Sequence, residues 1–150
     1  MFTLLFYTFI LLAVCVVIHI LTLSALLRYA SRFVGLATFR FWPATWMLVQ
    51  FAWWIILAHL AEILVWALFY TWRGVFPGFE TSAYFSAVTY TTVGYGDLVP
   101  PLNWRLLSGV EGLTGILMCG CSAGFFFAVV SRIFLGRAVE AGYQRQSSSG

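Results

Sequence analysis

The fold is decided by Thr91-Thr92-Val93-Gly94-Tyr95-Gly96-Asp97. Its two glycines stand two positions apart, and glycine adopts a left-handed backbone at little steric cost. We therefore expect an alternating backbone over residues 92–96 (the carbonyl segment), which aims successive carbonyl groups to one side. Rings of such carbonyls replace the hydration oxygens of an ion that leaves water. The segment thus predicts a cation-binding backbone, with the Thr92 hydroxyl as an added oxygen and the Tyr95 ring as an outward anchor.

The composition is that of a membrane protein. Of the 150 residues, 62% are hydrophobic and only 9% are charged, which sets the chain apart from soluble domains. Irregular backbone at membrane depth is tolerated only where it lines a cavity, so the carbonyl segment is expected to face a pore and not to form a surface turn. The net charge of +3 is too small to indicate nucleic acid as a partner. The three cysteines fall in apolar runs and predict no disulfide framework.

Three apolar stretches are long enough to cross ~30 Å of hydrocarbon. They comprise residues 2–27, 44–72 and 106–135. The first lacks the basic start of a signal peptide, so we expect it to be retained as a helix.

The segments between these spans have different compositions. Residues 28–43 mix arginine with aromatic residues, which predicts a cytoplasmic or interfacial connector, and Pro43 fits the first turn of the next helix. Residues 81–91 predict a helix too short to span, with Thr81 or Ser82 as its N-cap. Its C-terminal, partly negative end would point toward the membrane centre and favour a cation there.

All eight basic residues are arginines that flank the spans and predict the orientation. Six lie on one side and two on the other: Arg28, Arg32, Arg40, Arg132, Arg137 and Arg145, against Arg73 and Arg105. The larger group places the connector and the C-terminus in the cytoplasm, and the N-terminus and Asp97 outside. Residues 138–150 form a polar C-terminal tail, and residues 144–150 at its end are expected to be disordered.

Ionisable residues inside the spans are expensive and usually face protein or water. His59 and Glu62 are three apart and share one helix face, and Glu111 lies in the third span. Three interpretations of Glu62 stay open: a link to the short helix or a proton-sensitive switch, a neutral side chain hydrogen-bonded in the bundle, or a metal ligand together with His59. His19 is expected to be a packed or hydrogen-bonded helix residue and not a ligand.

The carbonyl segment resembles the selectivity filter of potassium channels residue for residue. From Glu80 to Arg137 the chain resembles the pore module of the potassium channel superfamily, and it is similar to small bacterial channels with one pore loop per chain. Four further segments carry this similarity: residues 59–62, 84–86, 104–107 and 111–115.

The resemblance implies an all-α integral membrane protein of the bacterial inner membrane, with three transmembrane helices, a re-entrant pore helix and a filter. Four regions follow: residues 1–27 (N-terminal helix), 28–43 (connector), 44–137 (pore module) and 138–150 (tail). One filter per chain without an internal repeat implies a homotetramer in membrane lipids. K⁺ ions would bind at the carbonyls of the segment, with no organic cofactor; the implied ion-binding residues are Thr92, Val93, Gly94, Tyr95 and Gly96.

The resemblance also implies supporting and gating residues. The filter-supporting positions are Tyr84, Phe85, Asp97, Glu62 and Glu111. Tyr84 and Phe85 would brace Tyr95, and we hypothesise that Tyr84 donates a hydrogen bond to Asp97.

The inner helix, with Glu111 followed by Gly115, is similar to that of bacterial inward-rectifier-type channels. This resemblance implies a hinge at Gly115 and an apolar gate at Phe127, although packed or lipid-facing phenylalanines explain the latter position equally. Two departures limit the resemblance. Val88 replaces a pore-helix glutamate that pairs with the aspartate after the filter in some relatives, and Cys119 replaces the acid used for polyamine block, so strong rectification is not expected.

Passive potassium conduction is the function that this pattern favours. The alternatives are a weakly selective monovalent cation channel and a non-conducting regulatory or sensor subunit. The first two spans lack the regularly spaced arginines of a voltage sensor, and the segment after Arg137 is too short for a ligand-binding domain, so the stimulus stays open. No nucleophile–base set or phosphate loop indicates an enzyme.

Overall fold

The computed structural model describes residues 2–37 and 41–147, with side chains described for residues 2–32 and 42–133. Every regular element in these ranges is helical, which confirms the all-α prediction. The elements are α1 (Phe2–Ala37), α2 (Phe41–Trp72), α3 (Gly78–Tyr90), the short 3₁₀ helix η1 (Leu102–Trp104) and α4 (Arg105–Ser147).

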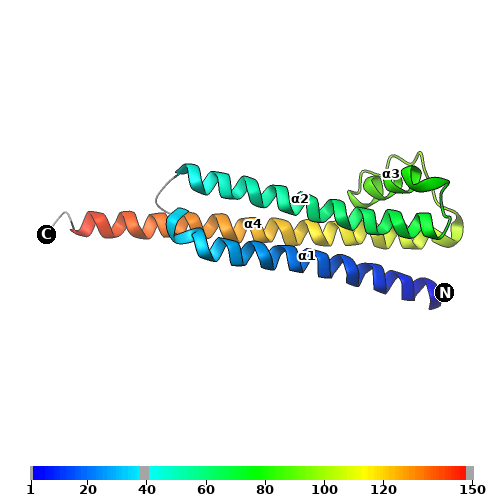
Figure 1. The fold of residues 1–150 in the computed structure, drawn as a ribbon, viewed down its shortest axis with the longest axis horizontal. Helices are drawn as coiled ribbons and strands as arrows, with labels where there is room; N and C mark the ends of the chain where they lie inside the picture. Colours follow the sequence, from blue (N-terminus) through cyan, green and yellow to red (C-terminus); the bar gives the residue numbers. More distant parts are fainter. Residues whose placement is uncertain (1, 38–40, 148–150) are drawn as a thin grey trace.

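Three long helices form an elongated bundle. Figure 1 shows α1, α2 and α4 running alongside one another, with α3 beside the C-terminal end of α2. The N-terminus lies at the α3 end and the C-terminus at the opposite end. Three stretches are long and apolar enough to cross a membrane, which confirms the predicted spans: Phe2–Arg32, Trp42–Trp72 and Leu102–Ile133.

The helices continue beyond the predicted spans. α1 continues to Ala37 and α2 begins at Phe41, so most of residues 28–43 is helix, although Pro43 does lie in the first turn. α4 also continues to Ser147, so residues 144–147 are helical where disorder was expected. A helix that is already nucleated propagates at little cost, and neither extension contains a proline to stop it.

The start of the short helix was also misplaced. α3 begins at Gly78 with Pro77 at the N-cap position, and no side chain caps it. Neither Thr81 nor Ser82 is the cap; the Ser82 hydroxyl donates to the Gly78 carbonyl at 3.0 Å, one turn back within the helix.

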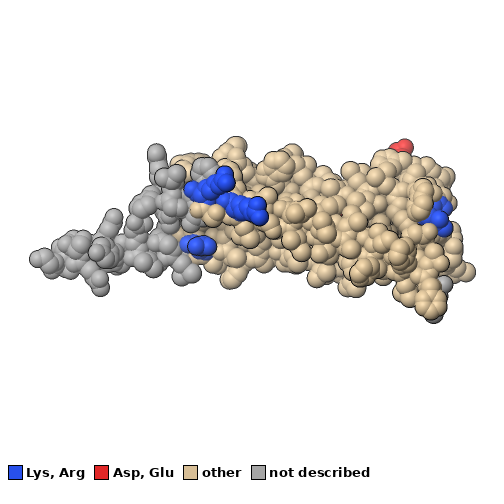
Figure 2. Space-filling view, turned by 60° about the horizontal axis from the view of Figure 1, so that its bottom comes forward, with Lys and Arg blue, Asp and Glu red and all other residues tan. Residues whose placement is uncertain are grey.

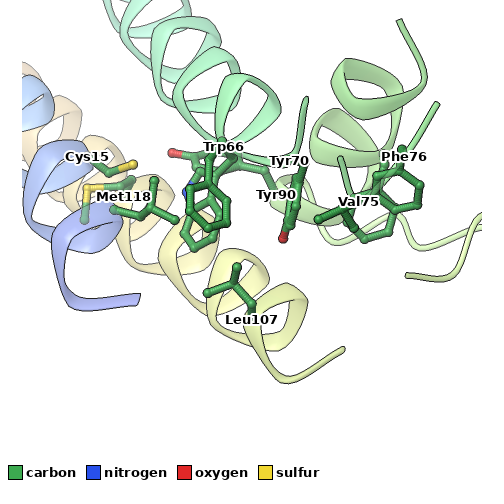
Figure 3. Packing of buried hydrophobic residues seen from close by; sticks show 11 residues of the cluster. Cys15, Trp66, Tyr70, Val75, Phe76, Tyr90, Leu107 and Met118 are labelled. Carbon is green, nitrogen blue, oxygen red and sulfur yellow. The ribbon is translucent and has the colours of Figure 1, made fainter. Parts of the chain in front are cut away.

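A buried aromatic cluster fixes α3 against the bundle. Figure 3 shows Trp66 and Tyr70 of α2 reaching toward Tyr90 of α3, with Leu107 of α4 beneath them. Phe85 extends the same cluster. Burial of such large side chains is the main apolar contribution to holding one element on another.

Arginines mark the two ends of the bundle. Figure 2 shows one group beside the grey C-terminal region and another at the α3 end. At the α3 end, the Arg73 guanidinium lies 5.2, 5.3 and 5.5 Å from the ring centroids of Tyr7, Trp72 and Trp104, within cation–π range. The side chains of Arg40, Arg137 and Arg145 lie outside the described residues.

Candidate functional site

The carbonyl segment has a strictly alternating backbone. Thr92, Gly94 and Gly96 have φ angles of +61°, +54° and +78°, and neither Val93 nor Tyr95 has a positive φ. The left-handed conformation expected of the two glycines is therefore confirmed, and Thr92 adds a third left-handed position that the sequence did not reveal. Alternation of this kind turns successive carbonyls to the same side of the chain.

The amides of this segment point back to α3. The Thr92 N–H donates to the Thr89 carbonyl at 3.0 Å, and the N–H groups of Val93 and Gly94 both donate to the Val88 carbonyl, at 3.0 and 3.3 Å. Within the described residues, no hydrogen bond is accepted by a backbone carbonyl of residues 92–96. The segment thus has anchored donors and free acceptors, and all five of its residues are exposed in the single chain.

The end of the segment is tied to α3 by a side-chain bond. The Tyr84 hydroxyl donates to Asp97 Oδ2 at 2.7 Å, which confirms the hypothesised bond. This hydrogen bond is the main reason why the pKa of Tyr84 is raised, because the neighbouring carboxylate favours the protonated phenol.

Phe85 does not brace Tyr95 of the same chain. Its ring packs on Tyr70 and Phe76, with centroid distances of 5.4 and 4.6 Å. Tyr95 is 72% exposed, and no ring contact to it occurs among the described residues. Phe85 therefore anchors α3 to α2 and makes no ring contact with Tyr95 within the described part of the chain.

Glu62 links α2 to the base of α3. Its carboxylate is fully buried and accepts the Tyr90 hydroxyl at the C-terminal end of α3. It also lies 2.9 Å from Nδ1 of His19, a residue of α1. The predicted polar link is thus present, and His19 is a hydrogen-bonded helix residue as expected. The pairing across 43 positions was missed because neither helix carries a signal for its neighbour.

Glu111 forms a second buried link. It accepts the Tyr70 hydroxyl at 2.9 Å, which joins α4 to α2 behind α3. Its other oxygen and the Ser86 hydroxyl have no hydrogen-bond partner among the described residues. Tyr70 was not singled out from the sequence, because an aromatic residue in an apolar span has no pattern that reveals a polar role.

The two predicted gating residues occupy different surroundings. Gly115 lies directly against the Tyr90 carbonyl, so close that an added Cβ would overlap it. Phe127 is 76% exposed, whereas Phe125 is 7% exposed and packed. α4 is one continuous helix through both positions, and the hinge and gate roles stay predictions.

Comparison with known protein families gives one match. A family model described as "Ion channel" matches residues 58–132, half of the chain. The chain belongs to the ion channel family. No significant match was found among curated proteins or among solved structures.

The matched region of this ion channel contains its polar site. It begins at the C-terminal half of α2 and runs through α3, the carbonyl segment and most of α4. Glu62, Tyr90 and Glu111 all fall inside it. α1 lies outside it, so His19 connects an additional helix to the channel region.

Proposed function

We propose that this protein is a passive potassium-selective channel in which four identical chains surround one pore lined by the carbonyls of residues 92–96. The observation that carries the proposal is the alternating backbone with its unpaired carbonyls. Unpaired carbonyls at membrane depth cost several kcal/mol each unless they bind something in the pore.

The electrostatics of the segment favour a cation. Carbonyl oxygens carry partial negative charge, and the C-terminal end of α3, directly before Thr92, adds the negative pole of the helix dipole. Asp97 follows at the other end of the segment. A cation that passes along the segment would therefore contact oxygen acceptors at each step. Carbonyl-lined filters replace the hydration oxygens of an ion in the same way.

Selectivity for potassium and assembly as a homotetramer rest on the filter resemblance and on geometry. A single carbonyl segment covers only one side of an ion, so several chains have to contribute. The exposed side chains of Val93 (52%) and Tyr95 (72%) offer surfaces for neighbouring chains, and closed symmetry needs one identical interface per chain.

The proposed orientation follows the arginines. Arg28 and Arg32 belong to the C-terminal part of α1, and Arg132 to the C-terminal half of α4. A group of basic side chains lies toward the end of the bundle away from α3 in Figure 2, and the positive-inside rule would place that end in the cytoplasm. The N-terminus and Asp97 would then face outward, in a bacterial inner membrane.

Ion flux into liposomes that hold the purified protein tests the proposal. We expect potassium flux to exceed sodium flux at least about tenfold, a difference of ~1.4 kcal/mol. Gly94→Ala should abolish the flux, because an alanine at φ +54° is strained by roughly 1–2 kcal/mol. No atom of the same chain lies within 4 Å of the added Cβ, so a clash within the chain would not explain the loss.

Gly109→Ala is the matched control, since its added Cβ also meets nothing within 4 Å but its backbone is helical. It should conduct normally. Equal sodium and potassium flux would support the weakly selective channel instead, and absence of flux at every pH would support a non-conducting subunit.

A further inference from the structure

Two histidines and a glutamate meet between α1 and α2. His19 Nδ1 lies 2.9 Å from Glu62 Oε1, and His59 Nδ1 lies 3.8 Å from Glu62 Oε2. One ligand atom from each of the three lies within 4.8 Å of the others. The side chains of His19 and Glu62 are almost fully buried, and that of His59 is 18% exposed, which leaves one route of access.

No permanent cation balances the Glu62 carboxylate. Within the described residues, its ion-pair partners are His19 and His59, and no arginine pairs with it. An unbalanced carboxylate inside a membrane span is costly. The negative charge is either removed by protonation of Glu62 or balanced by a protonated histidine or a bound metal ion.

The second nitrogen of each ring meets the same hydroxyl. Nε2 of His19 and Nε2 of His59 lie 3.1 and 3.2 Å from Ser122 Oγ on α4. A hydroxyl oxygen can accept from two donors, so both rings can donate their Nε2 hydrogen to Ser122. In that tautomer both Nδ1 lone pairs face the carboxylate, as metal ligands do, whereas the tautomer with hydrogen on Nδ1 donates it to Glu62 in a metal-free network.

From this geometry we propose that His19, His59 and Glu62 bind a divalent transition-metal ion such as Zn²⁺. Two histidines and one glutamate form a known zinc ligand set with a fourth position open. Tetrahedral ligands at 2.0–2.1 Å from zinc lie about 3.3 Å apart. This value falls between the two histidine–glutamate distances of 2.9 and 3.8 Å. Ser122 then orients both rings from behind, as hydrogen-bond partners of ligating histidines do.

The site joins a helix outside the channel match to one inside it. His19 belongs to α1, whereas His59 and Glu62 lie within the matched region 58–132. Tyr90 touches the cluster as well: its hydroxyl lies 3.0 Å from His59 Nδ1. A bound ion would therefore fasten α1 to α2 beside the base of α3.

Zinc binding to the full chain tests this site without reference to conduction. The parent is the Cys119→Ser/Cys121→Ser protein, because exposed thiols would bind zinc themselves. After chelator treatment, equilibrium dialysis against Zn²⁺ with elemental analysis should give one zinc per chain. Co²⁺ should give the visible absorption of a four-coordinate site.

His19→Gln is the decisive variant, since glutamine keeps polar character but loses the imidazole ligand. We expect it to weaken zinc affinity at least about 100-fold. Thr22→Val is the matched control on α1, because the Thr22 hydroxyl donates to the Ile18 carbonyl at 3.0 Å and makes no bond to the cluster among the described residues. It should bind zinc as the parent does.

Thermal unfolding of the parent keeps the test valid even if His19→Gln does not fold. Zn²⁺ should raise the parent's Tm and Mg²⁺ should not, because a ligand that binds only the folded state stabilises it. Far less than one zinc per chain, no rise in Tm, or equal zinc binding by His19→Gln and Thr22→Val would overturn the proposal in favour of a metal-free hydrogen-bond network.

Discussion

Thr92 has a backbone conformation that its side chain disfavours. It is the one non-glycine residue with a positive φ among those described, and left-handed backbone costs an L-residue roughly 1–2 kcal/mol. The hydrogen bond from its N–H to Thr89 helps to hold it there. Strain that persists in this way is typical of functional sites, and at Thr92 it extends the carbonyl alternation begun by Gly94 and Gly96.

Tyr84→Phe tests the hydroxyl bond at the other end of the segment. Removing the donor leaves Asp97 without its partner on α3, so we expect potassium flux to fall roughly two- to tenfold. The measurement is flux into liposomes at matched protein content. Asp97→Asn keeps an acceptor oxygen for Tyr84 and should lose less potassium flux than Tyr84→Phe.

The pH dependence of this effect has a definite sign. The bond raises the pKa of Tyr84 above its ordinary value of about 10, so the phenol stays protonated in the folded protein where it would otherwise ionise. The contribution of the bond is then fully present below pH ~10 and is lost as the pH rises through the raised pKa. If the difference in potassium flux between wild type and Tyr84→Phe became smaller between pH 7 and 9, this assignment would be contradicted.

Single residues differ in how far the sequence reveals them. The Tyr84–Asp97 bond follows from a motif in which both partners stand near the glycines. Tyr70 and Tyr90 carry equally specific bonds to Glu111 and Glu62, yet each pairing depends on how two helices are rotated against one another. That rotation is a property of tertiary packing and leaves no local pattern.

At the scale of elements, α3 is positioned by what lies at its base. Tyr90 bonds to Glu62 of α2, and its carbonyl rests against Gly115 of α4. Small residues let membrane helices approach closely, so Gly115 has a packing role in addition to the predicted hinge role.

Gly115→Ala separates these two roles. The added Cβ would overlap the Tyr90 carbonyl oxygen and lie 2.8 Å from its carbon, and backbone atoms cannot move aside cheaply. We expect a loss of about 1–3 kcal/mol in the free energy of unfolding, typical of overpacking, measured by thermal or denaturant unfolding in detergent. Gly109→Ala on the same helix should leave stability unchanged or slightly increased. Normal stability of Gly115→Ala with altered opening would instead favour the hinge.

Element interiors were predictable and element ends were not. Long apolar stretches leave a membrane helix as the only way to satisfy their backbone, so the three spans follow from composition. The positions where α1, α3 and α4 begin or end depend on small differences in free energy. One example is whether helix propagation continues past the last apolar residue. For that reason α1 and α4 continue past the predicted ends of the first and third spans.

At the scale of the whole molecule, the proposed assembly treats one chain as one part of a pore. The carbonyl segment is exposed along its length, and α4 exposes Leu113, Ile116 and Phe127. α1 packs on the opposite sides of α2 and α4 from α3 in Figure 1, which leaves the α3 side free for neighbouring chains.

Mixed assembly measures how many chains build one pore. If four chains contribute carbonyls and one distorted segment blocks conduction, an equimolar mixture of wild type and Gly94→Ala contains about one-sixteenth fully wild-type channels. Potassium flux should then fall to about that fraction of the wild-type value, while native mass spectrometry reports four chains per particle. The Gly109→Ala subunit, mixed in the same way, should leave flux unchanged. A fall to only about one quarter of the wild-type flux would indicate a dimeric pore. A fall to one half would mean that each chain conducts alone. A single carbonyl segment is open on one side, so an ion bound to one chain would be exposed to lipid.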